Sequence, residues 1–517
     1  MSSPTTETQP PAGERPRERA GQFLVDYLNL VFGRYLGMLV GVVRGVMVPR
    51  LLDPSTYGIY KSLLIIPTYV RAGHLGAVSG LSRQIPFYRG RGDDASLMAA
   101  VRVAYTFSLG SALLSCAILV AYSLTLQDPR TRIGLWIFLV FVVTGQQTKL
   151  QETYLLGHQR FVAVSRLNLA QNIYSTLLAI GGAWAFGLSG VIVATAIDGV
   201  VTLLLFRWVS GIGFPGFSLD RRVIRDLLSV GSPLLLTGLL GNVLFTVDRF
   251  VILKFLGTTA VGYYSLAAAF VVYVNDLSNL LSRVVFPKIV MSFGAGESTD
   301  RLKRFVHYPI TATSYTFPLL VIWIHYFCVW GFRLVYPKYL PGAAVMEILT
   351  FSILPYSHYL SYMNLVVAMK RQLGILWMYA LAIFVTTAIA LGAIWLDAGL
   401  TGVALGAVAG MFVISIVLYF HSEKHLLENE DRWPRFWRSY GPTFWVAAIV
   451  TGDWYLGRDA SVTVGHSLVR AGVVTLLYLP VVVLAWRWDE EFRSLMATAV
   501  RFTRFRKGVP PADGASS

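Results

Sequence analysis

The stretch RLLDPSTYGIY at residues 50–60 returns in altered form as KFLGTTAVGYY at residues 254–264. When the two are aligned, Gly58 meets Gly262 and Tyr60 meets Tyr264. Other landmarks repeat in the same order: Ser82-Arg83 with Ser282-Arg283, Pro86 with Pro287, Gln159-Arg160 with Lys370-Arg371, and GLSGV (187–191) with GLTGV (399–403). This order indicates that a six-helix unit has been duplicated. Two similar lobes around a cavity are typical of transporters, whose substrate site lies where the repeats meet.

The composition indicates a helical membrane protein. Of the 517 residues, 55% are hydrophobic and only 14% are charged, and the apolar runs are continuous and long enough to cross a bilayer as helices. The predicted spans are 27–48, 58–80, 97–124, 133–152, 165–186, 190–206, 229–250, 260–282, 305–326, 343–366, 374–395, 400–421, 440–457 and 467–486. The expected fold is therefore an all-α polytopic membrane protein with about 14 transmembrane helices, in two pseudo-symmetric six-helix lobes plus two C-terminal helices.

The positive charges predict the orientation. Lys and Arg concentrate in the segments on one side of the predicted spans, the side that holds both chain ends. Because cytoplasmic loops carry such an excess, both termini are predicted to be cytoplasmic. The net charge of +16 then reflects membrane topology, and no nucleic-acid partner is expected. The predicted parts are a disordered tail (1–24), an N-lobe (25–215), a C-lobe (216–425), spans 13 and 14 (426–490) and a cytoplasmic tail (491–517).

The sequence offers no sign of an enzyme. It lacks a phosphate-binding GxxxxGK[ST] loop, a zinc-type HExxH and a CxxC pair. The two cysteines, Cys116 and Cys328, fall in apolar spans, where core packing accounts for them. Any chemistry is therefore expected to be binding and conformational change inside the membrane, without a cofactor or a metal.

The run VDRFVILKFLGTTAVGYYSLAAAF at residues 247–270 resembles the signature of polysaccharide and O-antigen flippases. These belong to the multidrug/oligosaccharidyl-lipid/polysaccharide (MOP) exporter superfamily, as do lipid II flippases and MATE drug exporters. The matching positions are Asp248-Arg249, Leu256-Gly257, Gly262, Tyr264-Ser265 and Ala267. The resemblance implies a lobed MATE-like fold and alternating access. It also implies a cargo of undecaprenyl-pyrophosphate-linked oligosaccharide, carried to the outer leaflet of a bacterial inner membrane for O-antigen, capsule or exopolysaccharide.

An anionic pyrophosphate that crosses a membrane requires cationic groups inside the protein. Arg71 lies near the midpoint of the second predicted span, His74 follows at i+3 on the same helix face, and Arg34 lies toward the inner side of the first span. Arg suits this role because its guanidinium donates two parallel hydrogen bonds to a phosphate. These three residues are the predicted substrate-binding group. The alternative is that they pair with a carboxylate such as Asp198 between helices.

Several other polar residues lie within predicted spans. Asp198 is central in the sixth, and Asp276 with Asn279 forms part of a polar stripe in the eighth. Because a buried carboxylate can titrate or hold Na⁺, Asp198 and Asp276 are candidates for H⁺ or Na⁺ coupling, with salt bridges as the alternative. His358 is a candidate for lining the second lobe, where plain packing is the alternative. The motif pair Asp248 and Arg249 is a gate or structural candidate.

The leading hypothesis from the sequence is a lipid-linked oligosaccharide flippase. A lipid II flippase and a MATE-type exporter are the alternatives within the superfamily. A membrane-embedded polysaccharide polymerase or O-acyltransferase is the alternative from a different class, and the internal duplication and short outer loops argue against it. The expected partners are the polyprenyl-pyrophosphate-linked oligosaccharide, the lipid bilayer and polysaccharide-assembly proteins.

Overall fold

The structure is a computed structural model. It describes residues 36–127, 129–294, 299–369, 371–424, 426, 429–456 and 463–494. Within these ranges the chain is helical and contains no β-strand. The described residues divide into two compact units, the first within residues 36–51 and 66–235 and the second within residues 52–65 and 236–494.

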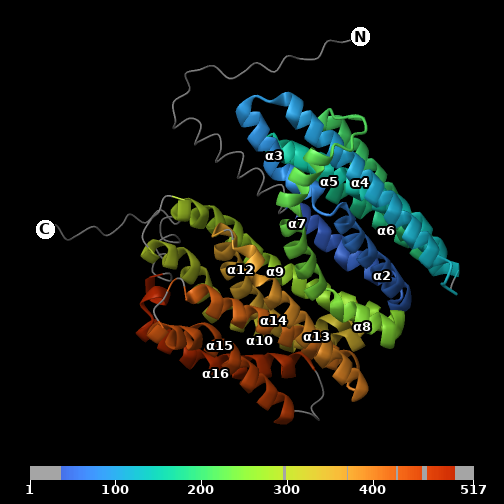
Figure 1. Cartoon of the computed structure of the whole chain (residues 1–517). Coiled ribbons are helices and arrows are strands. Elements are labelled where there is room, and N and C mark those ends of the chain that lie inside the picture. Colours follow the sequence, from blue (N-terminus) through green and yellow to red (C-terminus); the bar gives the residue numbers. More distant parts are fainter. Residues whose placement is uncertain are drawn as a thin grey trace, which may run out of the picture. The chain divides into compact units, whose positions relative to one another are not determined.

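The first unit contains a helical stretch over residues 36–51 and a set of long helices, drawn from dark blue to green in Figure 1. The helices α2 and α7 divide between the two units. Asp93 caps the start of α4, because its carboxylate accepts a hydrogen bond from the Ser96 backbone N–H at 2.9 Å. Hydrogen bonding to Ser96 also lowers the pKa of Asp93. The elements are α2 (Pro54–Val70), η1 (Arg71–His74), α3 (Ala77–Arg91), α4 (Asp94–Ser123), α5 (Pro129–Gly157), α6 (Phe161–Ser210) and α7 (Arg221–Leu244).

The helix α6 is a hairpin of two membrane-length helices. Its 50 residues would extend about 75 Å if straight, more than twice the roughly 30 Å hydrocarbon core of a bilayer. Gly187 interrupts it with φ 59° and ψ −130°. The two arms then lie side by side, since the Tyr174 and Thr202 hydroxyls are 2.5 Å apart. The two spans predicted at 165–186 and 190–206 correspond to these arms.

Replacing Gly187 by alanine should destabilise this hairpin. A residue with a Cβ at this φ and ψ carries backbone strain of about 1–3 kcal/mol, so the variant is expected to unfold at a lower temperature. Gly181→Ala is the matched control, because a Cβ there meets no atom within 4 Å. Thermal unfolding of the detergent-solubilised protein measures the difference, and equal midpoints for the two variants would contradict the assigned turn.

The second unit holds the remaining helices, drawn from yellow-green to red in Figure 1. The last two, α15 and α16, pack on α10, so they are part of this unit and not a separate body. The elements are α8 (Val247–Phe255), α9 (Gly257–Gly294), α10 (Thr299–Val335), η2 (Pro337–Tyr339), α11 (Pro341–Leu349), η3 (Thr350–Ser352), α12 (Ile353–Ala368), η4 (Gln372–Ile375), α13 (Leu376–Trp395), α14 (Gly399–Glu423), α15 (Asn429–Leu456) and α16 (Val464–Trp488).

The repeated GLSGV and GLTGV segments adopt the same turn. Gly187 has φ 59° and Gly399 has φ 58°, both in the left-handed region that glycine tolerates. The last glycine of each segment sits where two helices touch: a Cβ on Gly190 would lie 2.0 Å from the Gly182 carbonyl oxygen, and one on Gly402 would lie 2.3 Å from Ala393 Cβ. The sequence repeat is therefore also a repeat of backbone geometry.

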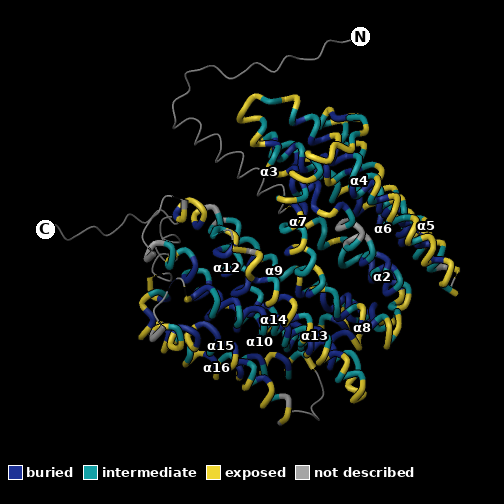
Figure 2. The backbone as a smooth tube through the Cα atoms, in the orientation of Figure 1, coloured by how far each residue is buried: buried dark blue, intermediate teal, exposed yellow. Residues whose placement is uncertain are grey.

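In the described part of the chain, nine helices are long and apolar enough to cross a membrane. Large apolar side chains on them are exposed, Trp395 at 88% and Phe384 at 69%, and Figure 2 shows exposed residues along the outward-facing helix surfaces. Such surfaces suit contact with lipid chains. The protein is thus a multi-pass membrane protein, and the total of about 14 spans and the lobe boundaries stay predictions. The nine helices are Asp94–Ser123, Thr131–Gly157, Phe161–Ser210, Arg221–Leu244, Gly257–Phe293, Leu302–Val335, Leu373–Trp395, Gly399–Glu423 and Val464–Trp488.

Candidate functional site

A pocket of about 310 Å³, with apolar walls and several polar side chains, lies inside the second unit. It forms where the short helix α8 meets the long helix α9 and the first turn of α12. The polar residues that line it include Asn242, Asp248, Arg249, Asn275, Asn279 and Tyr356, which come from α7, α8, α9 and α12. Three of these, Asp248, Arg249 and Asn279, are candidates that the sequence predicts. The pocket therefore joins the motif pair to the polar stripe of the eighth span.

The carboxylate of Asp248 is held firmly within this pocket. The side chain is buried, and it accepts hydrogen bonds from the Tyr264 hydroxyl and from the backbone N–H of Arg249. Tyr264 is itself fully buried. Both residues belong to the family-like motif, so the motif tyrosine fixes the motif aspartate. Because two donors hold this buried carboxylate in place, it forms a fixed part of the pocket lining.

Arg249 and Asn275 have hydrogen-bonding atoms that no described residue satisfies. Arg249 Nε and the Asn275 side-chain oxygen are both buried, and neither has a hydrogen-bond partner among the described residues. Buried polar atoms without partners are uncommon in folded proteins. Arg249 also makes no ion pair with a described carboxylate. The pocket therefore offers one unpaired guanidinium donor and one amide acceptor.

A second pocket, of about 400 Å³, lies inside the first unit. Its polar lining comes from η1, α3 and α5, and it consists of His74, Ser79, Ser82, Lys149 and Thr153. The His74 side chain is buried, and its Nδ1 accepts a hydrogen bond from the Gly76 backbone N–H at 3.1 Å. A neutral imidazole with this bond carries its proton on Nε2, which is then a donor. Lys149 Nζ pairs with Glu152 at 2.8 Å on the same helix, and 52% of its side chain stays exposed. The pocket is therefore cationic.

Of the three residues predicted to bind the pyrophosphate, the structure describes the side-chain surroundings of one. Arg34 lies outside the described residues. Arg71 is placed only as the first residue of η1. Of the predicted group, His74 alone has described side-chain contacts, and its neighbour in the pocket is Lys149, which the sequence does not single out. The prediction that Arg34 and Arg71 bind substrate stays a prediction.

Asp198 lies in the second arm of the α6 hairpin. Its side chain is 7% exposed, and its Oδ1 lies 3.3 Å from the Thr202 hydroxyl. That hydroxyl also donates to the Asp198 backbone carbonyl at 2.6 Å. Tyr174 on the first arm approaches the same hydroxyl. The carboxylate thus sits in a small polar core between the two arms, and its role in ion coupling stays a prediction.

The candidates on α9 and α12 have different surroundings. Asn279 lines the Asp248 pocket, donates to Asp276 Oδ1 at 2.8 Å and accepts from the Tyr356 hydroxyl at 3.1 Å. His358 has no exposed surface, and its Nε2 lies 3.0 Å from the Ser314 hydroxyl. It packs among α10, α12 and α15, while Tyr356 on the same helix reaches the pocket. Asp276 is therefore tied to the pocket through Asn279, and His358 is a core residue.

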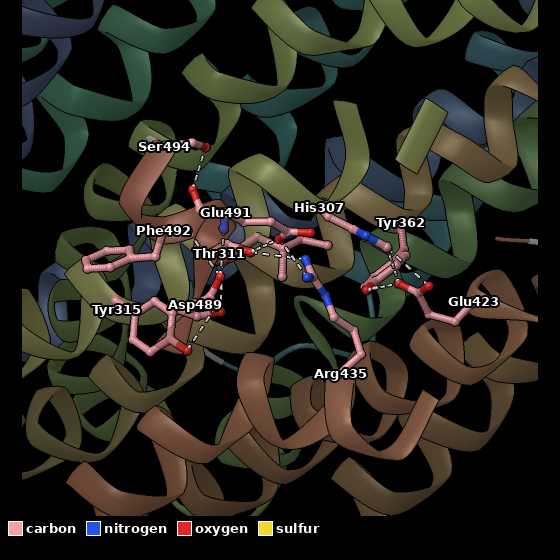
Figure 3. Close-up of polar contacts among 12 residues, drawn as sticks. His307, Thr311, Tyr315, Tyr362, Glu423, Arg435, Asp489, Glu491, Phe492 and Ser494 are labelled. Carbon is pink, nitrogen blue, oxygen red and sulfur yellow. Dashed lines mark hydrogen bonds and ion pairs between the residues drawn. The ribbon is translucent and has the colours of Figure 1, made fainter. Parts of the chain in front are cut away.

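A buried cluster of charged residues, which the sequence does not predict, lies elsewhere in the second unit (Figure 3). We call it the tail cluster. His307 Nε2 lies 2.9 and 3.1 Å from the two oxygens of Glu423, which also accepts from the Tyr362 hydroxyl at 2.6 Å. Beside this group, Arg435 donates to Glu491 at 2.6 Å and to the Thr311 hydroxyl at 3.0 Å. The cluster connects α10, α12, α14 and α15 to the segment that follows α16.

No group of three or more His, Cys, Asp or Glu side chains is arranged to bind a metal among the residues that the structure describes.

The model of one protein family matches more than half of this chain. The model of the family "Polysaccharide biosynthesis protein" matches residues 24–293. The chain belongs to this family of polysaccharide biosynthesis proteins. With the fold similarities below, the match confirms the resemblance to the polysaccharide flippases of the MOP superfamily that the motifs at residues 50–60 and 247–270 indicate. None of the curated protein sequences matches the chain significantly.

Solved structures share the fold at low sequence identity. The lipid II flippase MurJ, in an inward closed conformation, is 16% identical with a TM-score of 0.65, covering 90% of this chain and 99% of its own. An inward-facing multidrug resistance MATE transporter of the MOP superfamily is 16% identical with a TM-score of 0.61, covering 75% and 94%. A MOP superfamily transporter from Pyrococcus furiosus is 15% identical with a TM-score of 0.56, covering 77% and 94%. The fold is therefore that of MOP transporters.

Proposed function

We propose that this protein is a flippase that carries a polyprenyl-pyrophosphate-linked oligosaccharide across a bacterial inner membrane during surface polysaccharide biosynthesis. The observation that carries the proposal is the family match over residues 24–293. The MOP fold supports it, because the similar solved structures include transporters and a flippase. In this proposal both termini lie in the cytoplasm, and the protein acts without a cofactor and without making or breaking covalent bonds.

The two pockets supply what such a cargo requires. In the predicted orientation, Lys149 and His74 lie toward the inner end of their spans, where they would meet the pyrophosphate as it enters. Arg249 would bind the same group within the second unit, with the Asn275 and Asn279 amides and the Tyr356 ring available to sugar hydroxyls. Ionised donors bind phosphate about twice as strongly as neutral ones do. We assign pyrophosphate binding to Lys149 and Arg249, together with Arg71, Arg34 and the Nε2–H donor of His74.

We further propose that Asp198 binds the ion, H⁺ or Na⁺, whose gradient would drive transport. Its buried carboxylate has two hydroxyl neighbours, Thr202 and Tyr174, that suit either ion. Asp276 is a weaker candidate because its carboxylate is already engaged by the Asn279 amide.

A lipid II flippase is the second candidate function. The MurJ structure covers 90% of this chain, whereas the MATE and Pyrococcus structures cover 75% and 77%. The difference is comparable in length to α15 and α16. The lipid II flippase structure thus matches a larger share of this chain than these two transporter structures do, and lipid II is also a pyrophosphate-linked glycolipid.

Complementation in two bacterial strains distinguishes the candidates. One strain lacks its surface-polysaccharide flippase, and the other is depleted of its lipid II flippase. We expect this protein to restore surface polysaccharide in the first strain and not to restore growth in the second. The reverse result would establish the lipid II alternative. Restoration in neither strain, with correct membrane insertion and several donor glycans supplied, would overturn the proposal.

A further inference from the structure

A third pocket, of about 490 Å³, lies between the last two helices of the second unit. Its lining comes from α10, α15, α16 and the residue that follows α16, and it is mostly apolar and aromatic. The volume falls in the range of about 300–1,000 Å³ that small-molecule sites occupy. We call this cavity the α15–α16 pocket. It contains none of the residues assigned above to the cargo.

The buried side of the α15–α16 pocket is firmly built. Tyr315 of α10 is buried there, and its ring packs against Phe492 with 4.8 Å between the ring centroids. The Tyr478 hydroxyl of α16 donates to the Tyr315 backbone carbonyl at 3.0 Å. Because these contacts hold Tyr315 from two directions, the pocket is preformed.

The open side of the pocket is framed by indole rings. Trp437 and Trp445 of α15 and Trp488 of α16 all line it, and each is more than half exposed. Gly441 lies one turn from each of the two α15 tryptophans, on the same helix face. A Cβ on Gly441 would meet no atom within 4 Å. The α15 wall therefore leaves open space at Gly441, between two aromatic side chains.

The pocket follows the two helices from the membrane surface inward. In the orientation predicted from Lys and Arg, the start of α15 and the end of α16 both lie at the inner surface. Arg438 and Trp445 are two turns apart on α15, and Trp488 and Val481 are two turns apart on α16, which is about 10 Å of helix in each case. Tryptophan favours the headgroup level of a bilayer. The pocket is thus polar at the surface and apolar deeper in, as an amphiphile requires.

One cation lines the polar end of the pocket. Arg438 is exposed, and it makes no ion pair with a carboxylate in the part of the chain that the structure describes. The neighbouring guanidinium of Arg435 is already engaged by Glu491 at 2.6 Å. A guanidinium can donate two parallel hydrogen bonds to a phosphate. The polar end is therefore complementary to an anionic phosphate group.

The carboxylate of Asp489 also lines the pocket, but its oxygens are engaged by the protein. Oδ1 accepts hydrogen bonds from the backbone N–H groups of Glu491 and Phe492 at 3.0 and 3.2 Å, and Oδ2 accepts one from the Tyr315 hydroxyl at 3.4 Å. The side chain is buried. It is thus poorly placed to bind the ammonium group of a zwitterionic lipid, so the charges favour a headgroup with a net negative charge.

We propose that the α15–α16 pocket binds an anionic phospholipid of the inner leaflet, with its phosphate on Arg438 and an acyl chain beside Gly441. The bound lipid fastens α15 and α16 to α10. A phospholipid fits better than a glycolipid, because the described lining contains no Asn or Gln side chain to bind sugar hydroxyls. The proposal depends on the membrane fold and not on the identity of the cargo.

Thermal unfolding of the full chain in delipidated detergent tests the site. Phosphatidylglycerol should raise the Tm by several degrees and to saturation, because a ligand that binds only the folded state stabilises it. Phosphatidylcholine with the same acyl chains should have a clearly smaller effect. Native mass spectrometry of the same samples should show one phosphatidylglycerol retained per chain. Equal stabilisation by the two lipids would overturn the proposal.

Two variants and two matched controls locate the binding. Arg438→Gln should weaken phosphatidylglycerol binding roughly 10-fold or more and leave the Tm without added lipid unchanged, and Gly441→Leu should fill the space for the chain. Arg487→Gln is the charge control, since Arg487 is exposed at the same end of α16 and does not line the pocket. Gly452→Leu is the control on α15, because a Cβ there also meets no atom within 4 Å and the residue lies outside the pocket. Full binding by Arg438→Gln, or an equal loss in Arg487→Gln, would contradict the assigned site.

Undecaprenyl phosphate tests a different occupant of the same pocket. We expect it not to displace phosphatidylglycerol at equal concentration. If it does, the pocket holds a polyprenyl chain and the assignment to a phospholipid is wrong. These measurements need no transport, so a protein that restores no surface polysaccharide would overturn the proposed function and leave the result on the lipid site standing.

Discussion

Arg249→Gln is expected to abolish the restoration of surface polysaccharide. Glutamine keeps a hydrogen-bonding side chain but is shorter and carries no charge, and the pocket contains no other described cation. A hydrogen bond to a charged group contributes about 1.5–3 kcal/mol, which corresponds to a loss of roughly 10- to 100-fold in the rate of transport. Surface polysaccharide, measured at matched protein level in the membrane, gives the readout.

The matched control is Lys254→Gln on the same short helix. Lys254 is exposed at the C-terminal end of α8, where its ammonium contacts the Phe255 ring at 5.4 Å, and it does not line the pocket. The control removes the same charge at a distance from the pocket, so it should retain activity. Normal transport by the Arg249 variant would show that this charge is not needed, and an equal loss in both variants would show that it acts through the general field of the helix and not as a ligand.

Arg435→Met is expected to destabilise the protein by about 3–5 kcal/mol. The guanidinium is 7% exposed and pairs with Glu491 and Thr311 in the tail cluster. Removing it leaves the Glu491 carboxylate partly buried without its partner, and an unpaired buried charge is more costly than the pair is favourable. Thermal unfolding in detergent micelles, followed by tryptophan fluorescence, measures the shift in Tm.

Two further variants separate charge from packing. Adding Glu491→Met to Arg435→Met should recover part of the stability, because the stranded carboxylate is then gone. Arg438→Met, three residues along the same helix but exposed, should change Tm little. No recovery in the double variant would mean that the loss arises from packing.

The same pair sets a pH dependence. Burial raises the pKa of Glu491 while the Arg435 charge lowers it, and the net shift is downward. The pair therefore contributes its stability above the unfolded-state pKa of about 4.3 and loses it as the pH falls through the lower folded-state value. In Arg435→Met the charge that lowers the pKa of Glu491 is gone, so this contribution is lost and the fall in stability over the same acidic range should be smaller than in the wild type.

Local patterns were sufficient to predict part of the site. The acidic-basic motif led to Asp248 and Arg249, and the i+3 spacing on one helix face led to Asn279; all three line one pocket. The GLSGV and GLTGV repeats likewise marked the turns at Gly187 and Gly399. The residues that define each of these features lie within a few positions of each other in the chain. The sequence alone was therefore enough to indicate them.

Other features depend on contacts between distant residues. Glu423 is 116 residues from His307, and Arg435 is 56 residues from Glu491. Each lies near the predicted inner end of a span, where a charged side chain ordinarily reaches water. Lys149 also lies near the predicted inner end of a span, so the sequence gave no reason to single it out. The sequence gives only a weak indication at Glu423. It is a single acidic residue near helix ends that otherwise carry apolar and basic residues.

The segment after α16 determines how far the chain must extend to be stable. Asp489 accepts hydrogen bonds from the backbone N–H groups of Glu491 and Phe492, and the Phe492 ring packs against Tyr315 at 4.8 Å. A chain cut after Trp488 would still contain every membrane-length helix that the structure describes, yet it would lack the carboxylate that neutralises Arg435. The shortest stable version of this protein therefore ends beyond Phe492, several residues after its last hydrophobic helix.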